Sequence, residues 1–386
     1  MTYTVTVSKK GALRWERGHP WIYRSDVGPA RSPAGIVDVQ DGRGRFLGRA
    51  LYSPASEIRL RLLTREAEPI DRGFWERRLE RAAALRAGLE AQASAYRLVH
   101  AEADSLPSLI VDRYGEYLVV QLLSAGLEAV REQVLEAICN VFQPRGVLLR
   151  NDAPVRRLER LPLEVVEAFG SVPEIIEVRE GNVGYLVAPR TGQKTGAFLD
   201  QRENRELAGT LARGRALDLF TYQGLFALYL ARNAQEVTAV DSSGPALELA
   251  KENARLNGID RIEWVEADVF DFLPRLEREG RRFDCIVVDP PPFARQKTAL
   301  RRALAGYKEI NLRAMRLLTE GGVLLTFSCS FHVGKPEFLS MLGAAAADSG
   351  RRIALERLLG QPRDHPEMLT IPETGYLKGA VLRALD

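Results

Sequence analysis

The chain has 386 residues, of which 46% are hydrophobic and 27% charged, and its net charge is +3. This length exceeds what one hydrophobic core usually organises, so two or three domains are expected in an ordinary globular protein. The longest apolar runs, such as residues 323–327, are too short to cross a bilayer, and no secretory signal is visible at the start. The sequence therefore favours a cytoplasmic protein that does not enter a membrane.

The cysteines and the charge distribution give two further indications. Cys139, Cys285 and Cys329 form neither a disulfide framework nor a spaced zinc site, and no metal is expected. At least one thiol must be unpaired, which leaves a thiol for a chemical task. Residues 1–70 contain 12 Lys/Arg and 7 Asp/Glu, a surplus of 12 − 7 = 5. Such a basic module suits a polyanion, although many solvated surfaces are equally basic.

The first two predicted domains comprise residues 1–68 and 69–180. Residues 1–68 are dense in Gly and Pro, and their β-rich runs at 35–39 and 58–63 predict a small β-barrel. The second segment predicts a compact α+β domain. Its helices are expected over 74–90 and 125–142, and its strands over 109–112, 117–122 and 146–149, with a turn at 113–116.

The third predicted domain, residues 181–386, has a regular alternation of strands and helices from about residue 212. Strands are predicted at 216–220, 237–240, 262–265, 285–288 and 323–327. Helices are predicted at 225–232, 245–256 and 303–318. This order predicts a mostly parallel sheet covered on both faces, with its ligand site at the carboxyl ends of the strands.

Four acids lie at or near the ends of the first four of these strands: Asp218, Asp241, Asp268 and Asp289. They are 23, 27 and 21 residues apart (241 − 218, 268 − 241 and 289 − 268), each gap being about one βα unit. One carboxylate per strand end indicates a shared crevice. Each acid taken alone could instead cap the following helix, where Asp is favoured.

The residue types at these strand ends predict a cofactor that carries positive charge. A dinucleotide site needs G-x-G-x-x-G, and the first turn has only Gly224. S-adenosylmethionine fits better, because its ammonium, sulfonium, ribose hydroxyls and adenine amino group suit carboxylates. Asp218 and its turn are expected at the methionine end, Asp241 at the ribose and Asp268 at the adenine. The expected binding residues are Asp218, Phe220, Thr221, Tyr222, Gly224, Asp241, Ser242, Asp268, Val269 and Asp289.

The reacting groups are predicted at the ends of the fourth and fifth strands. The prolines after Asp289 force the chain out of the sheet, so Pro290, Pro291 and Phe293 are expected against a flat base, unless the turn only ends the strand. Cys329 is predicted beside them as a nucleophile, although a single cysteine near a strand end more often packs. Cys139 and Cys285 are expected in the core.

These groups suit methyl transfer to carbon 5 of a pyrimidine. That carbon becomes nucleophilic once a thiolate has added at C6, and a carboxyl group at the N3 edge stabilises the adduct for cytosine. Cys329 and Asp289 would fill these roles. The sequence does not identify the base that removes the C5 proton.

Motifs along nearly the whole chain resemble the bacterial family of ribosomal RNA cytosine-C5 methyltransferases that act on large-subunit RNA. Residues 192–205 (GQKTGAFLDQRENR) carry the most specific similarity. Further matches are residues 18–23 and 47–54 (its PUA module), 102–107 and 111–115 (its middle domain), 328–330 and 376–379. Residues 156–161 (RRLERL) depart from the family pattern and weaken the expectation of RNA contacts in the middle domain.

The resemblance implies a Rossmann-like class I S-adenosylmethionine methyltransferase domain, preceded by a PUA-like barrel and the α+β domain. It implies Cys329 as nucleophile, Asp289 as the partner of the base edge and 5-methylcytosine as product. It also implies that Phe198, Asp200 and Arg202 border the cofactor. Arg190 and Lys194 are expected to contact ribosomal RNA phosphates, the alternative being a solvated loop.

Two other functions stay open at this point. One is methylation of an exocyclic amine of guanine or adenine, which needs no thiol. The other is an RNA-binding assembly factor that only senses the cofactor. The target nucleotide, the choice between naked RNA and an assembled subunit, and the oligomeric state, for which a homodimer is one candidate, are not determined by the sequence.

Overall fold

The computed structural model describes residues 3–293 and 300–386, which divide into two compact units. Unit 1 comprises Met1–Val178, Val187–Leu199 and Arg363–Thr374. Unit 2 comprises Arg179–Leu186, Asp200–Pro362 and Gly375–Asp386. Each unit is therefore built from three separate segments of the chain.

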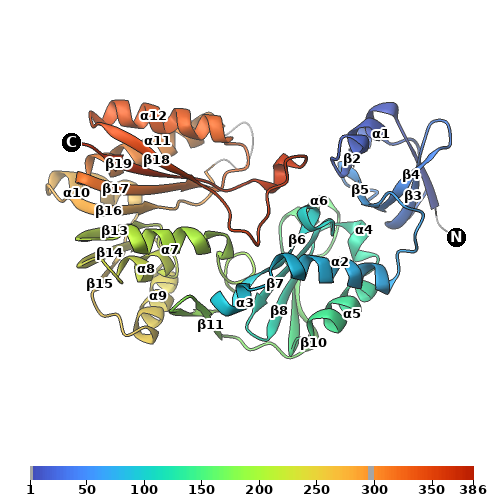
Figure 1. The fold of residues 1–386 in the computed structure, drawn as a ribbon, viewed down its shortest axis with the longest axis horizontal. Coiled ribbons are helices and arrows are strands. Elements are labelled where there is room, and N and C mark those ends of the chain that lie inside the picture. The colour runs from blue at the N-terminus through green and yellow to red at the C-terminus, as the bar shows by residue number, and fades with distance from the viewer. Residues whose placement is uncertain (1–2, 294–299) are drawn as a thin grey trace. The chain divides into compact units, whose positions relative to one another are not determined.

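The first part of unit 1 is a five-stranded sheet with the order β1-β3-β4-β5-β2 (Figure 1). Its strands are β1 (Tyr3–Val7), β2 (Trp21–Tyr23), β3 (Gly35–Asp41), β4 (Phe46–Tyr52) and β5 (Ile58–Thr64). Helix α1 (Lys9–Glu16) begins at Ser8, whose hydroxyl accepts a hydrogen bond from the Gly11 amide. Trp15 and Ile22 are buried in the core of this part. The strands predicted at 35–39 and 58–63 are confirmed.

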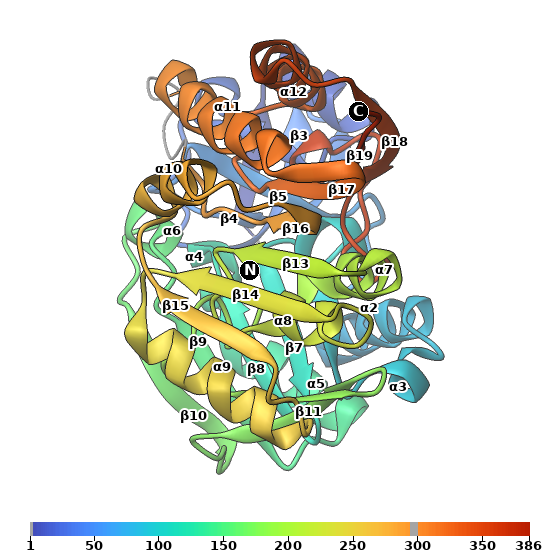
Figure 2. The ribbon, with the colours of Figure 1, turned by 90° about the vertical axis from the view of Figure 1, so that its left-hand side faces the viewer.

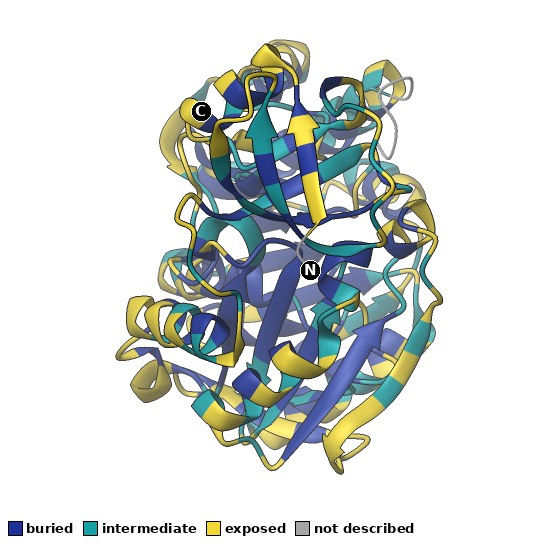
Figure 3. Ribbon diagram, turned by 90° about the vertical axis from the view of Figure 1, so that its right-hand side faces the viewer, coloured by how far each residue is buried: buried dark blue, intermediate teal, exposed yellow. Residues whose placement is uncertain are grey.

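The second part of unit 1 is a five-stranded sheet with the order β10-β9-β8-β7-β6. Its strands are β6 (Ala95–His100), β7 (Leu109–Tyr114), β8 (Tyr117–Leu122), β9 (Gly146–Asn151) and β10 (Glu164–Gly170). All residues of β6 and β9 are buried, whereas the edge strand β10 is largely exposed. Figure 3 shows buried segments of the ribbon in dark blue and exposed segments in yellow.

The two long helices predicted in this part are each interrupted. The segment predicted as a helix over 74–90 forms α2 (Arg72–Leu85) and α3 (Leu89–Gln92), because Gly88 adopts a left-handed conformation with φ +83°. The segment 125–142 forms α4 (Ala125–Glu128) and α5 (Arg131–Phe142). The apolar spacing continues across both breaks, so periodicity alone did not locate them. The short helix α6 (Val155–Leu158) follows β9.

Unit 2 contains a seven-stranded sheet with the order β15-β14-β13-β16-β17-β19-β18. The strands are β13 (Arg215–Leu219), β14 (Glu236–Asp241), β15 (Ile262–Glu266), β16 (Phe283–Val288), β17 (Leu318–Ser328), β18 (Ile353–Leu359) and β19 (Lys378–Ala384). The first five are parallel, and β19 pairs antiparallel with both β17 and β18. The predicted mostly parallel sheet is confirmed, and its last two strands, β19 and β18, were not predicted.

Helices cover both faces of this sheet (Figure 2). On one face α10 (Val269–Arg278), α11 (Leu300–Arg316) and α12 (Lys335–Ser349) pack in succession. On the other face lie α7 (Arg202–Leu211), α8 (Leu225–Leu230) and α9 (Gly244–Leu256). The central strands β13 and β16 are mostly apolar and buried, which is why they read as hydrophobic runs, whereas β15 is only partly buried and β18 is largely exposed.

Two further strands, β11 (Ile176–Glu180) and β12 (Val183–Val187), form a small two-stranded sheet. Within the described ranges, no helix combines the length and the apolar character that crossing a membrane requires.

The strand order of unit 2 determines where a ligand can bind. From β13 the chain proceeds to β14 and β15 on one side, and β16 returns to pair with the other side of β13. Helices that leave β13 and β16 on opposite faces open a crevice between the carboxyl ends of these two strands. Asp218 and Asp289 lie at these two ends.

Candidate active site at the strand ends of unit 2

The loop after β13 has a strained backbone around the first acid. Phe220 and Tyr222 have φ values of +64° and +49°, a conformation that side chains disfavour. Gly224 has φ +80°, and a Cβ there would lie 2.7 Å from the Trp264 ring. The Thr221 amide donates a hydrogen bond to the Val240 carbonyl (3.0 Å), which ties the loop to the next strand. This loop is therefore shaped by contacts with the neighbouring strands.

Asp218 is fully buried and has no cationic partner among the described residues. The Thr221 hydroxyl donates to Asp218 Oδ2, while Asp218 Oδ1 is buried without a hydrogen-bond partner. Burial, together with the nearby charges of Asp289 and Asp241, raises the pKa of Asp218 to about 8, against the opposing effect of hydrogen bonds from Thr221 and the Ala227 backbone. A buried carboxyl oxygen left without a donor indicates a place for a ligand that donates or carries positive charge.

Asp241 and Asp268 receive backbone hydrogen bonds in different ways. Asp241 accepts from the Tyr222 amide (2.9 Å) and from the Ser243 amide (2.9 Å), so it connects the loop after β13 with the end of β14, next to Ser242. Asp268 caps α10 by accepting from the Phe270 amide (2.7 Å), and Val269 is the first helical residue. The helix-cap alternative therefore applies to Asp268, whereas Ser243 caps α9.

The turn after β16 brings Asp289 and an aromatic cluster together. The Asp289 amide lies 3.4 Å from the Leu219 carbonyl of β13. Pro290 is buried and Pro291 is exposed. The Phe293 ring lies 4.7 Å from Tyr307, 6.0 Å from Phe270 and 6.5 Å from Phe220, measured between ring centroids.

Cys329 lies beside this turn. It follows the last residue of β17, and β17 pairs with β16 so that Thr326 is opposite Val288. Cys329 Sγ is half-buried and lies 4.0 Å from the Pro290 carbonyl oxygen. Cys285, in contrast, is fully buried in β16, and burial raises its pKa to about 12. Among the three cysteines, Cys329 alone combines partial exposure with a position at the strand ends.

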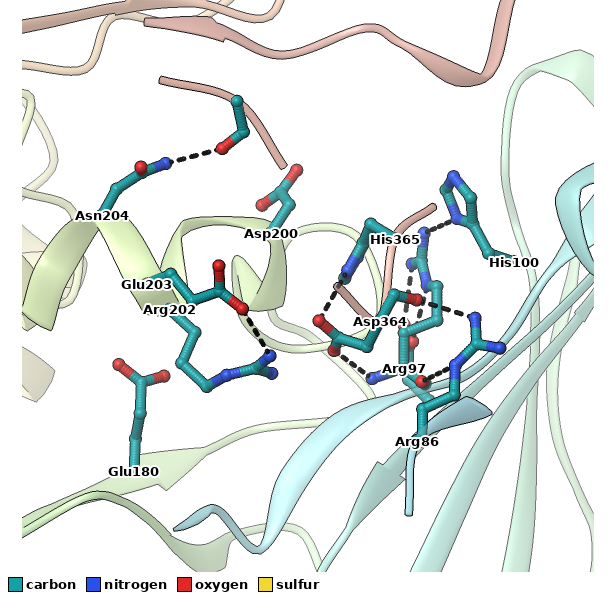
Figure 4. A network of polar contacts seen from close by, with 12 residues as sticks. Arg86, Arg97, His100, Glu180, Asp200, Arg202, Glu203, Asn204, Asp364 and His365 are labelled. Carbon is teal, nitrogen blue, oxygen red and sulfur yellow. Dashed lines mark hydrogen bonds and ion pairs between the residues drawn. The ribbon is translucent and has the colours of Figure 1, made fainter. Parts of the chain in front are cut away.

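Two residues of the predicted cofactor border, Asp200 and Arg202, are buried in unit 2 (Figure 4). The Tyr376 hydroxyl donates to Asp200 Oδ2 (2.7 Å). The Arg202 guanidinium lies 3.6 Å from the Glu203 carboxylate. Asn204, on the same helix α7, donates to the Gly360 carbonyl (3.1 Å). This part of the 192–205 motif therefore packs against the segment near residue 376, a second motif of the resemblance.

The other predicted residues of this motif lie in unit 1. The Lys194 ammonium is exposed and lies 4.4 Å from the centre of the Phe198 ring. Arg190 pairs with Glu167 and donates to the Val172 carbonyl, so part of its charge is already compensated. Arg156, in the segment that departs from the family pattern, is fully buried and paired with Glu128 (2.8 Å). It has a structural role in the fold.

A buried ionic network of unit 1 was not predicted, and Figure 4 shows the part of it around Arg86, Arg97 and Asp364. Arg86 binds both carboxylate oxygens of Asp104 (2.6 and 2.7 Å), and Arg97 does the same with Asp112 (2.8 and 3.0 Å). The Asp364 carboxylate accepts from the Arg97 amide (2.9 Å). The network holds the segment Arg363–Thr374 to the sheet of β6 and β7.

Three further residues near the strand ends were also missed. Asn253 of α9 is buried and donates to the Gln223 carbonyl (3.0 Å), which fixes the loop after β13. Tyr307 and Lys378 both bind Ser330, the residue after Cys329. The sequence offered one signal for Lys378, a lysine at the start of a mostly apolar run. Nothing in the spacing of α11 distinguished Tyr307.

Comparisons with known proteins agree with this architecture. The model of a PUA-like domain matches residues 5–65, and that of an S-adenosylmethionine-dependent methyltransferase matches residues 150–382. A solved structure described as a methyltransferase complexed with SAH is similar at a TM-score of 0.87 and 20% identity, covering 99% of this chain and 100% of that chain. These findings confirm the predicted fold, and the methyltransferase family model confirms the predicted cofactor, S-adenosylmethionine.

Curated relatives match over the full length of the chain. Ribosomal RNA large subunit methyltransferase I of Tolumonas auensis is 42% identical over 397 residues, covering 100% of both chains. The protein with this name from Klebsiella pneumoniae (strain 342) is 40% identical over 381 residues, covering 96% of this chain and 95% of the relative.

Proposed function

Because this chain belongs to the family of Ribosomal RNA large subunit methyltransferase I, we propose that it methylates carbon 5 of a cytosine in large-subunit ribosomal RNA. The reaction uses Cys329 as a covalent nucleophile and Asp289 as the acid at the base edge. The observation that carries this proposal is the position of the Cys329 sulfur, half-buried and 4.0 Å from the carbonyl of the residue after Asp289. A thiol and a carboxyl group thus follow adjacent strands.

The strand-end acids of unit 2 suit S-adenosylmethionine. The orphaned Oδ1 atom of Asp218 and the absence of a cation beside Asp218 and Asp241, among the described residues, favour a ligand with positive charge. The loop residues that accompany them are proposed binding residues as well: Phe220, Thr221, Tyr222, Gly224, Ser242, Asp268 and Val269. Asp200 and Arg202 of unit 2 and Phe198 of unit 1 are proposed at the cofactor border on the resemblance. When bound, S-adenosylmethionine supplies an electrophilic methyl group.

The chain's own residues prepare the base for this methyl group. The Cys329 thiolate adds to C6 and forms an S–C6 bond, while Asp289 donates a proton to N3, so that the ring electrons make C5 nucleophilic. After C5 has gained the methyl group, a base takes the C5 proton. The electrons of that C–H bond restore the C5–C6 double bond, the S–C6 bond breaks, and the N3 proton returns to Asp289.

RNA recognition is proposed for residues of both units. The PUA-like residues 5–65 belong to the basic N-terminal segment and suit a polyanion. Arg190 and Lys194 are proposed to contact phosphates. Pro290, Pro291 and Phe293 are proposed to contact the target base, because a rigid prolyl turn and an aromatic ring suit a flat surface.

The test is to incubate the protein with unmodified ribosomal RNA and labelled S-adenosylmethionine, and to identify the methylated nucleoside by mass spectrometry. We expect 5-methylcytidine. Cys329→Ala should lower the methylation rate at least about a thousandfold, as loss of a covalent nucleophile does, with unchanged cofactor affinity. Cys139→Ala, at the half-buried cysteine of α5, is the matched control and should remain active.

Three results would contradict the proposal in different ways. Full activity of the Cys329→Ala variant would reject covalent catalysis. Detection of a methyl group on an exocyclic amine of guanine or adenine would show direct amine methylation in place of methylation at C5. Tight cofactor binding without transfer to any RNA would favour an assembly factor that only senses the cofactor.

A further inference from the structure

The turn that carries Cys329 is held from two sides by buried polar groups of unit 2. Lys378, the first residue of β19, lies opposite Ser328 in the β17–β19 register. Only 4% of Lys378 is exposed, and its ammonium group donates to the Ser330 carbonyl (2.8 Å) and the Tyr376 carbonyl (2.7 Å). A buried cation is costly, so a lysine here requires a compensating use.

Tyr307 holds the same turn from α11. Its ring is fully buried, and its hydroxyl forms a hydrogen bond with Ser330 Oγ (2.8 Å). Burial raises the pKa of Tyr307 above its ordinary value, and the charge of Cys329 raises it further, against hydrogen bonds from Ser328 and Ser330. The phenol therefore stays neutral and acts as a fixed support of the turn.

The charges around the turn have opposite effects on the thiol. The Lys378 ammonium group lies 2.8 Å from the carbonyl oxygen of Ser330, the residue after Cys329, and a nearby cation in a buried site favours a thiolate. Among the described residues, further titratable groups on the packed elements are Asp289 after β16, Tyr307 on α11, His332 on the turn itself, and Lys335 on α12, which lines one cavity with Lys378. An ionised Asp289 destabilises the thiolate of Cys329, because both groups are negative. A neutral Tyr307 neither stabilises nor destabilises the thiolate through its charge.

We propose that Lys378 is a positioning residue, which fixes the backbone at Ser330 and favours the thiolate form of Cys329. The inference rests on the proposed role of Cys329 as nucleophile and deepens it. It assigns to the 376–379 motif a chemical task in the same site.

The test measures the thiol directly, without RNA or cofactor. The rate of Cys329 alkylation by iodoacetamide is followed against pH by mass spectrometry, with Cys329→Ser as background. Cys285 and Cys139 contribute little, because burial raises the pKa of both. In the wild type we expect a midpoint below about 8.5, the ordinary value for cysteine.

Lys378→Met should raise this midpoint by about one pH unit, which lowers the thiolate fraction at pH 7 about tenfold. Lys378→Arg should keep it near the wild-type value. Tyr307→Phe should leave it nearly unchanged, and Asp289→Asn should lower it. Lys251→Met, at an exposed lysine of α9, is the control for removal of a charge elsewhere in unit 2.

Methylation adds a second readout. The Lys378→Met variant should methylate RNA about tenfold more slowly at pH 7 and recover at higher pH, with unchanged cofactor affinity. An unmoved midpoint in folded Lys378→Met protein overturns the proposal. A wild-type midpoint at or above about 8.5 overturns it as well, even if the variant does not fold. If Cys329→Ser methylates RNA normally, the proposed function fails, while the alkylation data still decide the effect of Lys378.

Discussion

Buried acids occur in both units, but their surroundings differ. In unit 1, Asp104 and Asp112 each bind an arginine through both carboxylate oxygens, at 2.6 to 3.0 Å. In unit 2, Asp218 is equally buried, yet neither it nor Asp241 has an arginine or lysine partner among the described residues. These two acids are held by a hydroxyl and by backbone amides instead, although unit 2 also contains a buried pair of the first kind, Glu180 with Arg205.

The difference separates buried carboxylates that stabilise the fold from a buried carboxyl group that can bind a ligand. A carboxylate that an arginine already satisfies contributes to the fold, and it has no capacity left for a cationic ligand. A carboxylate group that lies near other acids, without a cation, stays costly until a ligand supplies the donors. Asp218 therefore differs in kind from the buried acids that an arginine satisfies, which its residue type alone does not reveal.

The largest expected effect concerns the arginine pairs of unit 1. Arg86→Met leaves the buried Asp104 carboxylate without its partner, which should lower the free energy of unfolding by about 3–5 kcal/mol. Urea unfolding measures this loss. Arg72→Met, at the first residue of α2, is the matched control, because the Arg72 side chain is exposed and loss of its pair with Glu76 should cost less than about 1 kcal/mol. Equal losses in both variants would remove the basis of the comparison.

The second effect concerns Asp218, whose buried carboxyl has a pKa of about 8 in the folded protein and about 3.9 when unfolded. Between these values the folded state holds a proton that the unfolded state has released. Stability from this group is therefore present below about pH 4 and is lost as the pH rises to about 8. Compared with Asp218→Asn, the wild type should lose stability between pH 5 and pH 8, on the order of a few kcal/mol.

The same variant tests the binding use of Asp218. At pH 8, Asp218→Asn should weaken S-adenosylmethionine binding about 10- to 100-fold, the effect of losing a charge-assisted hydrogen bond. Wild-type affinity should rise from pH 6 to pH 8 relative to the variant, because the ligand favours the ionised carboxylate. Calorimetric titration measures both. A variant that binds as tightly as the wild type would assign Asp218 to the fold, like the acids of unit 1.

The smallest effect concerns the shape of the loop that accompanies Asp218. Both Gly224 and Gly258 have positive φ values (+80° and +64°), but a Cβ at Gly224 meets the Trp264 ring at 2.7 Å, and one at Gly258 meets nothing within 4 Å. Gly224→Ala should therefore cost about 1–3 kcal/mol more than Gly258→Ala, because of overpacking. Thermal unfolding compares the two variants. Cofactor affinity should fall only for Gly224→Ala.

The sequence by itself determined the parallel strands of unit 2, their acidic ends and the thiol after β17. These features are local: continuous apolar runs form buried strands, and residues at the ends of parallel strands share one edge of the sheet. The resemblance added the family and the expected chemistry. The breaks in the two helices of unit 1 were missed, because apolar spacing continues across them.

Only the tertiary structure decided which charges are satisfied and which are not. The pairs of Arg86 with Asp104 and of Arg97 with Asp112 span 18 and 15 residues, and the contacts of Lys378 with Ser330 span 48. Such contacts depend on strand order and register, which no local pattern encodes. The free-energy cost of a buried carboxylate depends on its partners. The tertiary contacts therefore determine whether a carboxyl group is paired with a cation, caps a helix or is available to a ligand.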